Sequence, residues 1–259
     1  MSLLLSLILV LAACGNNNGQ GAKSNKTLLE TIKAEGKIQI GTEGTYAPFT
    51  YHDKDGNLTG FDVELAREVA ERLGVEAEFI ETKWDGMFAG LDAKRFDFVA
   101  NQVSIRDDRK EKYDFSSPYI VSKAVLIVHE DNEDIKKLAD LQSKKAGQSL
   151  TSNLTDIAKA NGAEIVQTDG FNQAIELLIS KRIDATVNDG LSFLDFKKQK
   201  PDSPIKIVDE TNDASQSGFL FNKGNPELVE AVNKALEEMK EDGTYLEISE
   251  KYFGADVSK

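Results

Sequence analysis

Short apolar runs with the composition of β-strands alternate with longer amphipathic runs along most of this chain. Residues 62–74, DVELAREVAERLG, carry apolar side chains at helical spacing and end at a glycine, and a strand-like run, EAEFIET, follows them. The same alternation continues as far as IKIVDE at residues 205–210, and it includes a predicted helix at residues 134–141, DIKKLADL. Because helices in such an order lie over the strands that they connect, we predict an α/β fold built on parallel or mixed sheets.

Two stretches of the chain echo one another, LDAKRFDFVAN at residues 91–101 and LISKRIDATVN at residues 178–188. Each contains a helix end, a Lys-Arg pair, an aspartate and a buried strand. The echo is either a chance match of common residues or the trace of two related halves. In the second case Gln102 corresponds to Asp189, and both lie just beyond the carboxyl end of a strand, where open α/β sheets bind ligands. Two such halves would face each other across one cleft.

Two extended segments, residues 115–124 and 212–221, lie where the chain must cross between the halves. Two crossings predict a hinge of two strands, in which the first lobe is discontinuous and is completed by the C-terminal helices. We therefore predict a first lobe formed by residues 27–121 and 215–259, and a second lobe formed by residues 122–214.

The N-terminal segment has the features of an export signal. Residues 3–13, LLLSLILVLAA, form an apolar run that is too short to span a bilayer stably. The end of this run and Cys14, the only cysteine, resemble the bacterial lipobox, although the usual basic residues before the run are missing. A chance cysteine is the alternative. The resemblance implies a signal peptide at residues 1–13, a lipidated Cys14 and a tether at residues 14–26, which would anchor the protein to the outer face of the cell membrane.

Charge and composition exclude several classes of protein. The net charge is −13 and no basic stripe is present, so we expect no nucleic-acid partner. With two histidines and one cysteine, a structural zinc site is not expected. Residues 53–64 have a superficial likeness to a calcium loop, but Leu58 stands where that loop requires glycine. Because the common catalytic motifs are also missing, we predict no catalytic residue and no cofactor.

A polar segment, ANQVSIRDDRK at residues 100–110, follows one of the apolar strands. One interpretation is a solvated loop in which Arg109 pairs with Asp107 or Asp108 at the surface. The other is an anion site, because a guanidinium can grip a carboxylate through two parallel hydrogen bonds. In that case the hydroxyl of Ser104 could contribute a further hydrogen bond.

Similar alternatives hold for the other candidate residues. Thr151 and Ser152 open a predicted helix, either as a simple N-cap or as an anion site formed by free backbone N–H groups. Asp189 is either the N-cap of the next helix or an acceptor for an ammonium group. Tyr46 and Trp84 are either core residues or apolar walls that cover the stem of a ligand. A carboxylate grip, an ammonium acceptor and apolar walls together fit an α-amino acid.

Several motifs resemble those of one protein family. GTEGTYAPFTY, GNLTGFDVELAREVAERLG, RIDATVND and the C-terminal KALEEMKEDGTYLEISEKYFG are similar to the polar amino-acid-binding proteins of ABC importers, the bacterial extracellular solute-binding proteins of family 3. ETKWDGMFAGL, ANQV and AGQSLTSN further resemble the cystine-binding lipoproteins of Gram-positive bacteria. The resemblance covers nearly all of residues 27–257. It implies a two-lobed fold like that of type II periplasmic binding proteins, in which each lobe is a mixed sheet flanked by helices.

The resemblance also implies ten ligand-binding residues, namely Glu43, Tyr46, Trp84, Asn101, Gln102, Ser104, Arg109, Thr151, Ser152 and Asp189. Arg109 would grip the α-carboxylate of the ligand, assisted by Thr151 and Ser152. Asp189 would accept the α-ammonium together with Ser104 and the backbone near Gln102.

The remaining residues would hold the rest of the ligand. The two aromatic side chains would line its stem, and Glu43 and Asn101 would face its distal end. Leu150 and Gln102 depart from the family pattern, because glycine and a small hydroxyl residue are frequent at these two places. For a cystine ligand, whose second head is also zwitterionic, the distal polar groups would be Glu43, Asn101, Gln102, Gln148 and Asn153.

The expected function is therefore that of an extracytoplasmic lipoprotein. It would capture a polar amino acid, with L-cystine as the first candidate, by lobe closure, and the permease of an ABC transporter would recognise the closed form. We expect a monomer that touches the membrane only through its lipid anchor. The alternatives are another ligand (glutamine, histidine, lysine or arginine), a dehydratase-type enzyme on the same fold, and a sensor ectodomain, which would require a membrane-spanning helix.

Overall fold

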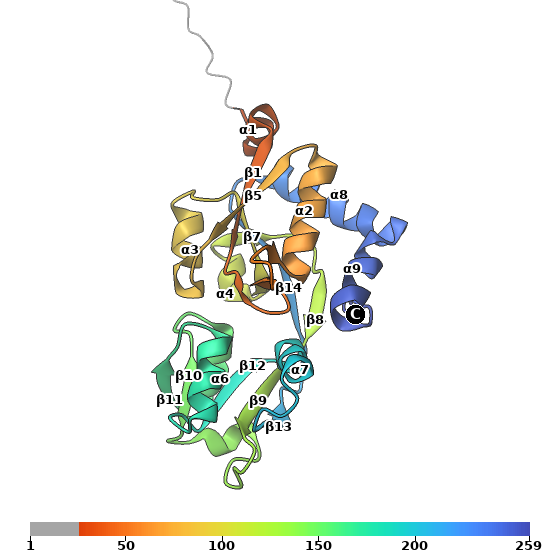
Figure 1. Ribbon diagram of the computed structural model, residues 1–259. Helices are drawn as coiled ribbons and strands as arrows, with labels where there is room; N and C mark the ends of the chain where they lie inside the picture. Colours follow the sequence, from red (N-terminus) through yellow and green to blue (C-terminus); the bar gives the residue numbers. More distant parts are fainter. Residues whose placement is uncertain (1–25) are drawn as a thin grey trace, which may run out of the picture.

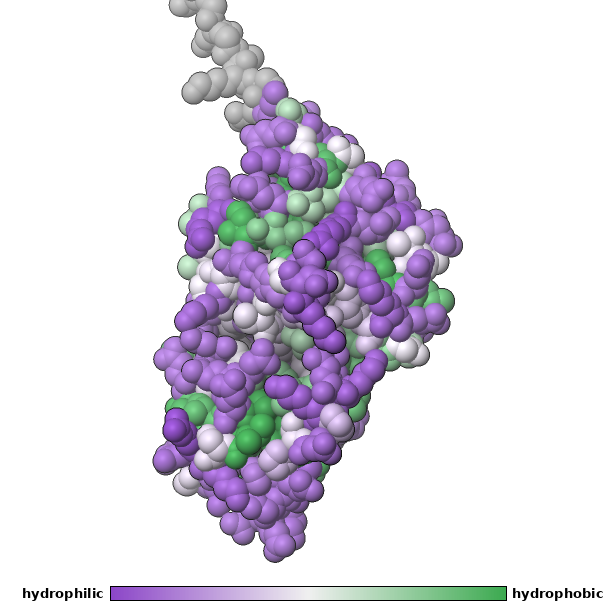
Figure 2. Space-filling model, in the orientation of Figure 1, coloured by the Kyte–Doolittle hydropathy of each residue, from purple (hydrophilic) through white to green (hydrophobic). Residues whose placement is uncertain are grey.

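The computed structural model describes residues 26–259, so Cys14, the expected signal peptide and nearly all of the expected tether lie outside the described residues. Residues 26–259 fold into two lobes (Figure 1). No helix within them is long and apolar enough to cross a membrane. The face shown in Figure 2 is largely hydrophilic, as expected for a chain with 44 acidic and 31 basic residues.

The sheet of lobe 1 combines parallel and antiparallel strands. Its order is β5 (Glu76–Glu81), β1 (Lys37–Thr42), β6 (Phe98–Ser104), β14 (Ser215–Asn222) and β7 (Tyr113–Phe115), and β8 (Ile120–Ser122) also pairs with β14. β1 runs parallel to β5 and β6, whereas β14 runs antiparallel to β6, β7 and β8. A small antiparallel sheet is formed by β2 (Thr45–Tyr46), β3 (Thr50–His52) and β4 (Leu58–Thr59).

Helices cover the sheet of lobe 1. They are α1 (Leu28–Glu35), α2 (Phe61–Leu73), α3 (Trp84–Asp92), α4 (Asp107–Lys110), α8 (Pro226–Asp242) and α9 (Thr244–Phe253). α2 buries the apolar stripe that includes Leu65 and Val69, and it ends at Gly74, whose φ of 76° lies in the left-handed region that favours glycine. α8 begins with Pro226 at its first turn, where the missing N–H of proline costs nothing.

Lobe 2 repeats the mixed plan. Its strand order is β11 (Glu164–Gln167), β10 (Lys145–Gln148), β12 (Ala185–Asp189), β9 (Ala124–His129) and β13 (Ile205–Glu210). β10 is parallel to β11 and β12, and β9 is antiparallel to β12 and β13. The helices of this lobe are α5 (Asn153–Ala160), α6 (Phe171–Ile179) and α7 (Gly190–Gln199). The carboxyl ends of β6 and β12 both contribute residues to the cavity between the lobes.

The chain passes between the lobes twice. It leaves the first sheet after β8 and enters the second at β9, and it returns from β13 to β14. Ser122 and Ser215 are paired where β8 and β14 run side by side, so both crossings lie at one place. Two mixed sheets flanked by helices and joined by two strands confirm the fold class predicted from the sequence.

Two local predictions were wrong. The first concerns residues 134–141, DIKKLADL, where a helix was expected and the structure has only the short 3₁₀ turn η1 (Leu138–Leu141). The side chain of Asp140 accepts hydrogen bonds from the backbone N–H groups of Lys136 and Lys137, and that of Asn132 accepts one from Ile135. These side-chain bonds satisfy the backbone groups locally, so a helical ladder is not needed.

The second correction concerns the polar residues after Ala100. They continue strand β6 as far as Ser104, so Gln102 lies within the strand rather than beyond its end, and Asp189 is the last residue of β12. The pairing of β6 with β14 shifts register around Gln102, whose φ is 49°. Such a bulge redirects a side chain without ending the strand. Sequence reasoning placed Gln102 beyond the strand because the apolar pattern stops, but a strand that borders a cleft needs polar side chains there.

Candidate ligand-binding site

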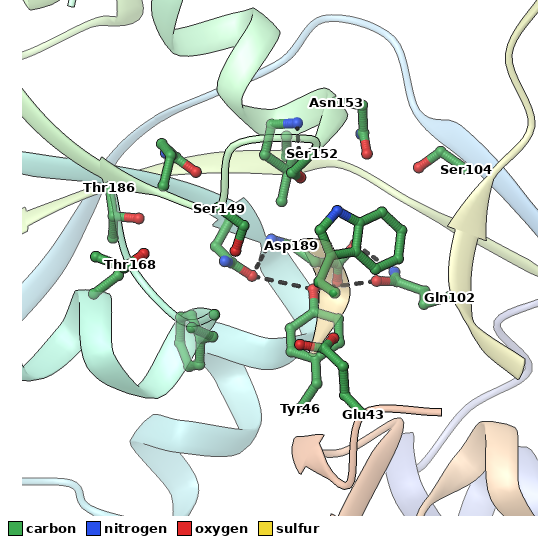
Figure 3. Close-up of a pocket in the computed structure, with 18 of the residues that line it drawn as sticks. Glu43, Tyr46, Gln102, Ser104, Ser149, Ser152, Asn153, Thr168, Thr186 and Asp189 are labelled. Carbon is green, nitrogen blue, oxygen red and sulfur yellow. Dashed lines mark hydrogen bonds between the residues drawn. The ribbon is translucent and has the colours of Figure 1, made fainter. Parts of the chain in front are cut away.

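A cavity lies between the two lobes, and residues of both lobes line it (Figure 3). Eight of the ten residues predicted for ligand binding are among its lining residues: Glu43, Tyr46, Trp84, Asn101, Gln102, Ser104, Ser152 and Asp189. Gln148 and Asn153, expected for the distal end of a cystine ligand, also line it. Arg109 and Thr151 do not. The cavity therefore gathers residues that are up to 172 positions apart, from Glu43 to Ser215.

Asp189 is a buried carboxylate at the end of β12. Its two oxygens accept hydrogen bonds from the backbone N–H of Leu191 at 2.8 Å, from Nε2 of Gln102 at 2.7 Å and from the hydroxyl of Ser122. No lysine, arginine or histidine nitrogen within residues 26–259 lies within 4.0 Å of it. Burial raises the pKa of the Asp189 carboxyl, and these hydrogen bonds oppose the rise. Asp189 is thus both the N-cap of α7 and an acceptor suited to an ammonium group.

Gln102 connects the two lobes through its side chain. Its amide donates to Asp189, and its Oε1 accepts from the hydroxyl of Tyr46 at 3.2 Å. The same hydroxyl lies 3.1 Å from Oδ1 of Asn188 in lobe 2. Figure 3 shows Tyr46, Gln102 and Asp189 converging on one part of the cavity. The bulge in β6 is what directs the Gln102 side chain toward lobe 2.

Behind Gln102 lies a second buried carboxylate. Oδ2 of Asp62 accepts the backbone N–H of Gln102 at 2.5 Å and the hydroxyl of Tyr119 at 2.6 Å, whereas its Oδ1 has no hydrogen-bond partner within the described residues. Burial is the main cause that raises the pKa of the Asp62 carboxyl to about 7. Sequence reasoning missed Asp62, because an acidic residue in the first turn of a helix reads as an ordinary surface charge.

Arg109 lies next to the cavity rather than in its lining. It is 7% exposed, its Nη1 donates to the backbone oxygen of Ser104 at 3.0 Å, and its guanidinium lies over the rings of Trp84 and Phe88. Ser104 and Trp84 line the cavity, so Arg109 is one layer behind its wall. Burial lowers the pKa of the Arg109 guanidinium to about 10, so it remains charged at neutral pH.

The neighbouring aspartates do not neutralise Arg109. Asp108 pairs with Arg106 at 2.9 Å, and Asp107 lies 3.7 Å from Lys110. Within residues 26–259 no carboxylate oxygen comes within 4.0 Å of Arg109. The surface ion pair that was one interpretation of this arginine is therefore not formed.

The two residues at the start of α5 differ in their surroundings. Ser152 caps α5 by accepting from the N–H of Leu154 at 3.2 Å, and it lines the cavity. Thr151 is exposed, and its hydroxyl and N–H both donate to Oδ1 of Asp85, at 2.9 Å and 3.0 Å. Asp85 belongs to lobe 1, so this contact crosses the cleft. The hydroxyl and N–H of Thr151, which were expected to assist a ligand carboxylate, are therefore bonded to Asp85 instead.

Further contacts join the lobes around the cavity. Lys83 pairs with Asp169 at 2.6 Å, and Arg106 pairs with Asp156 at 2.8 Å. The side-chain amide of Asn172 donates to the backbone oxygen of Thr45 at 3.1 Å. With the bonds of Asp85 and Gln102, these contacts define a closed arrangement of the two lobes.

The end of the cavity near Glu43 has its own set of polar groups. Nδ2 of Asn101 donates to Oε2 of Glu43 at 2.7 Å, and Oδ1 of Asn101 accepts the backbone N–H of Glu43 at 2.8 Å. Burial raises the pKa of the Glu43 carboxyl. Two lining groups, Nε1 of Trp84 and Oγ1 of Thr168, are buried and have no hydrogen-bond partner within the described residues. Sequence reasoning missed Thr168, although its place directly after β11 is the same kind of signal that identified Asp189.

The comparisons with known proteins agree with one another. The family model of the bacterial extracellular solute-binding proteins, family 3, matches residues 38–255. L-cystine-binding protein TcyA of Bacillus subtilis (strain 168) is 50% identical to this chain, and the match covers 97% of this chain and 95% of TcyA. The L-cystine solute receptor of Neisseria gonorrhoeae, in an unliganded open conformation, is 50% identical, with coverage of 90% of this chain and 100% of the receptor and a TM-score of 0.60.

A third relative is less similar in sequence and more similar in structure. An ancestral arginine-binding protein bound to arginine is 41% identical to this chain. The match covers 84% of this chain and 98% of the ancestral protein, with a TM-score of 0.80. The higher score against a liganded protein, and the lower score against an open one, agree with the closed arrangement of the lobes in this structure. On these grounds the chain belongs to the bacterial extracellular solute-binding proteins, family 3.

Proposed function

We propose that this protein captures L-cystine between its lobes and delivers it to the permease of an amino-acid ABC transporter. The observation that carries the proposal is a pair of buried, opposite and unpartnered charges. Asp189 lines the cavity and Arg109 lies one layer behind its wall, and neither has a counter-charge within the described residues. Because an uncompensated buried charge is costly, the fold calls for a ligand that supplies both counter-charges, as a zwitterionic amino-acid head does.

The carboxylate of this head would lie against the Arg109 and Trp84 side of the cavity. Within residues 26–259, Arg109 uses only Nη1 in a hydrogen bond to the protein, to the backbone oxygen of Ser104. The indole N–H of Trp84 is a donor without an acceptor within residues 26–259. Both groups can only donate, so they call for an anionic or other acceptor atom. The ammonium would replace the Gln102 amide as the partner of Asp189.

The amide-rich walls support a ligand with a second polar end. Gln102, Gln148 and Asn153 line the cavity, and their amide groups could bond to a second polar end of a ligand but not to an aliphatic one. Two of the relatives described above are named for L-cystine. Arginine is the second candidate, because Glu43 is a half-buried carboxylate without an ion-pair partner within residues 26–259 and a relative of known structure is bound to arginine.

Calorimetric titration distinguishes the candidates. We expect L-cystine to bind more tightly than arginine, lysine, histidine or glutamine. A reductant should abolish the binding of cystine by splitting the ligand, because a chain with one cysteine has no internal disulfide to lose. The same reductant should leave the binding of any non-disulfide ligand unchanged. If one of the other four amino acids outcompetes cystine, the cystine assignment is wrong.

Closure of the lobes would couple binding to delivery. We place lobe 1 at residues 27–121 and 215–259 and lobe 2 at residues 122–214, so that the lobes turn on the paired residues Ser122 and Ser215. Closing around the ligand would then present both lobes together to the permease. A monomer suffices for this role, because both halves of the cavity come from one chain.

We also propose that the protein is a lipoprotein. The apolar run at residues 3–13 and the single Cys14 support this, as does membership of a family of extracellular binding proteins. Residues 1–13 would then be removed, and the acyl chains on Cys14 would hold the protein at the outer face of the membrane. A Cys14→Ala variant, compared with wild type by cell fractionation, should appear in the medium or remain an uncleaved precursor. If it is processed and membrane-bound like wild type, Cys14 is not the anchor.

A further inference from the structure

Thr168 carries a polar atom that the protein leaves unsatisfied at the wall of the cavity. The residue is 2% exposed, and its Oγ1 has no hydrogen-bond partner within residues 26–259. Its backbone is held by a bond from its N–H to the oxygen of Gln148 at 3.0 Å, so the side chain is well positioned. Figure 3 shows its hydroxyl directed toward the interior of the cavity. A buried hydroxyl without a partner is unfavourable unless something else binds it.

The N-terminus of α6 opens into the cavity beside Thr168. Gly170 is the N-cap, with a φ of 86°, and it makes no side-chain cap to the helix. Gly170, Phe171 and Ala174 all line the cavity, so the first turn of α6 borders it. The side chain of Asp169, which could have capped the helix, pairs with Lys83 instead. The helix start therefore offers free N–H groups and the positive end of the helix dipole to an anion.

A carboxylate faces this helix start from the other lobe. Oε1 of Glu43 lies 3.5 Å from the position that a Cβ would occupy on Gly170, and its Oε2 is held by Asn101. Glu43 has no ion-pair partner within 4.0 Å in residues 26–259. One small region thus contains an acceptor for a cation and donors for an anion.

The structure also provides room for a second ligand end at this place. A neighbouring cavity shares Glu43, Trp84, Ser149, Thr168 and Gly170 with the first one and extends beyond them toward Lys83 and Asp169. The region formed by Glu43, Thr168 and the start of α6 therefore lies between the two cavities. An elongated ligand that enters from the Asp189 side would reach it.

We propose that Thr168 and the N-terminus of α6 bind a second carboxylate, and that Glu43 binds a second ammonium, so that this region is a subsite for the second head of a two-headed amino acid. The inference rests on the proposed function, since the first head must occupy the Asp189 and Arg109 side. In this proposal, the Thr168 hydroxyl selects a ligand with two zwitterionic ends over a ligand with one.

The test compares a two-headed with a one-headed ligand. L-cystine and S-methyl-L-cysteine share the first head and the sulfur but differ in the second head. In Thr168→Val the hydroxyl is replaced by a methyl group of similar size. We expect this variant to bind cystine at least tenfold more weakly than wild type, while its affinity for S-methyl-L-cysteine changes less than twofold. Thr168→Ser, which keeps the hydroxyl, should retain most of the cystine affinity.

Glu43→Gln is a second, independent variant. Its affinity for cystine should also fall more than its affinity for S-methyl-L-cysteine. Circular dichroism and the melting temperature check that each variant is folded. Suppose that wild type binds cystine but that Thr168→Val lowers the affinity for neither ligand, or lowers both affinities equally. The second-head subsite is then overturned and the proposed function stands. If wild type binds another amino acid and no cystine, the cystine assignment fails and the subsite fails with it.

Discussion

The hydroxyl of Thr151 donates to the carboxylate of Asp85 at 2.9 Å, across the cleft between the two lobes. The same carboxylate accepts the backbone N–H groups of Thr151 and Leu150, at 3.0 Å and 3.2 Å. Asp85 lies in the first turn of α3 in lobe 1, and both partners precede α5 in lobe 2. One exposed side chain thus makes three hydrogen bonds that exist only when the lobes are closed.

Asp85→Ala should therefore weaken ligand binding by destabilising the closed form. Each net hydrogen bond contributes roughly 0.5–1.5 kcal/mol, and exposure reduces the sum, so we expect a loss of affinity of about tenfold. The melting temperature of the unliganded protein should change little, because Asp85 is exposed and lies outside both cores. Calorimetry measures the affinity, and small-angle scattering with and without ligand measures closure. Asp107→Ala, which removes an exposed acid from α4, is the matched control, and equal affinities of both variants would contradict the prediction.

Arg109→Ala should abolish the grip on the ligand carboxylate. Removing one partner of a buried ion pair costs roughly 3–5 kcal/mol, so the affinity should fall at least about a hundredfold. Arg109→Lys keeps the charge without the planar fork and should recover only part of the affinity. Lys110→Ala is the control, because its ion pair with Asp107 lies at the surface within α4 and contributes about 0–1 kcal/mol. Near-normal binding by Arg109→Ala, measured by calorimetry, would show that this arginine does not hold the ligand.

Asp189→Asn should weaken binding without disturbing the fold. Asparagine is as good an N-cap as aspartate, so α7 keeps its bond from the N–H of Leu191, while the ligand ammonium loses its charged partner. We expect at least about a hundredfold loss of affinity. In wild type the affinity should also fall as the pH falls, because burial raises the pKa of the Asp189 carboxyl and only the ionised form attracts the ammonium. A variant with wild-type affinity would contradict the role of Asp189.

Asp62 should make the stability of the protein depend on pH. Burial raises the pKa of its carboxyl to about 7 in the folded protein, so the folded state holds a proton that the unfolded chain releases near its ordinary pKa of 3.8. The resulting stabilisation is complete below about pH 4 and is lost as the pH rises through about 7. The negative charge of Asp189 raises the pKa of Asp62 further. The hydrogen bonds that Asp62 accepts from Tyr119 and from the backbone N–H of Gln102 lower this pKa.

Asp62→Asn removes this titration and leaves the other acids in place. Urea unfolding of both proteins across this pH range should show the free energy of unfolding of wild type falling relative to that of the variant as the pH rises from about 4 to about 8. A constant difference between the two proteins over this range would mean that Asp62 does not titrate there.

Much of the architecture was predictable from sequence because it depends on local patterns. The apolar spacing of residues 62–74 and the glycine at its end define α2. The alternation of strand and helix patterns predicted two mixed sheets, and the extended segments predicted the two crossings at β8 and β14. The same reasoning failed at residues 134–141, where side-chain bonds to the backbone replaced a helix whose apolar spacing looked adequate.

For the candidate site, the sequence by itself determined which side chains lie at strand ends and helix starts, and together with the family resemblance this named ten residues, eight of which line one cavity. Only the tertiary structure decided which of those groups have partners. Within the part of the chain that the structure describes, it left Arg109 and Asp189 without counter-charges and the hydroxyl of Thr168 without a hydrogen-bond partner, and it gave the donors of Thr151 to Asp85. The physical reason is that burial and pairing depend on contacts between the two lobes, and these join residues too far apart in the chain for any local pattern to record.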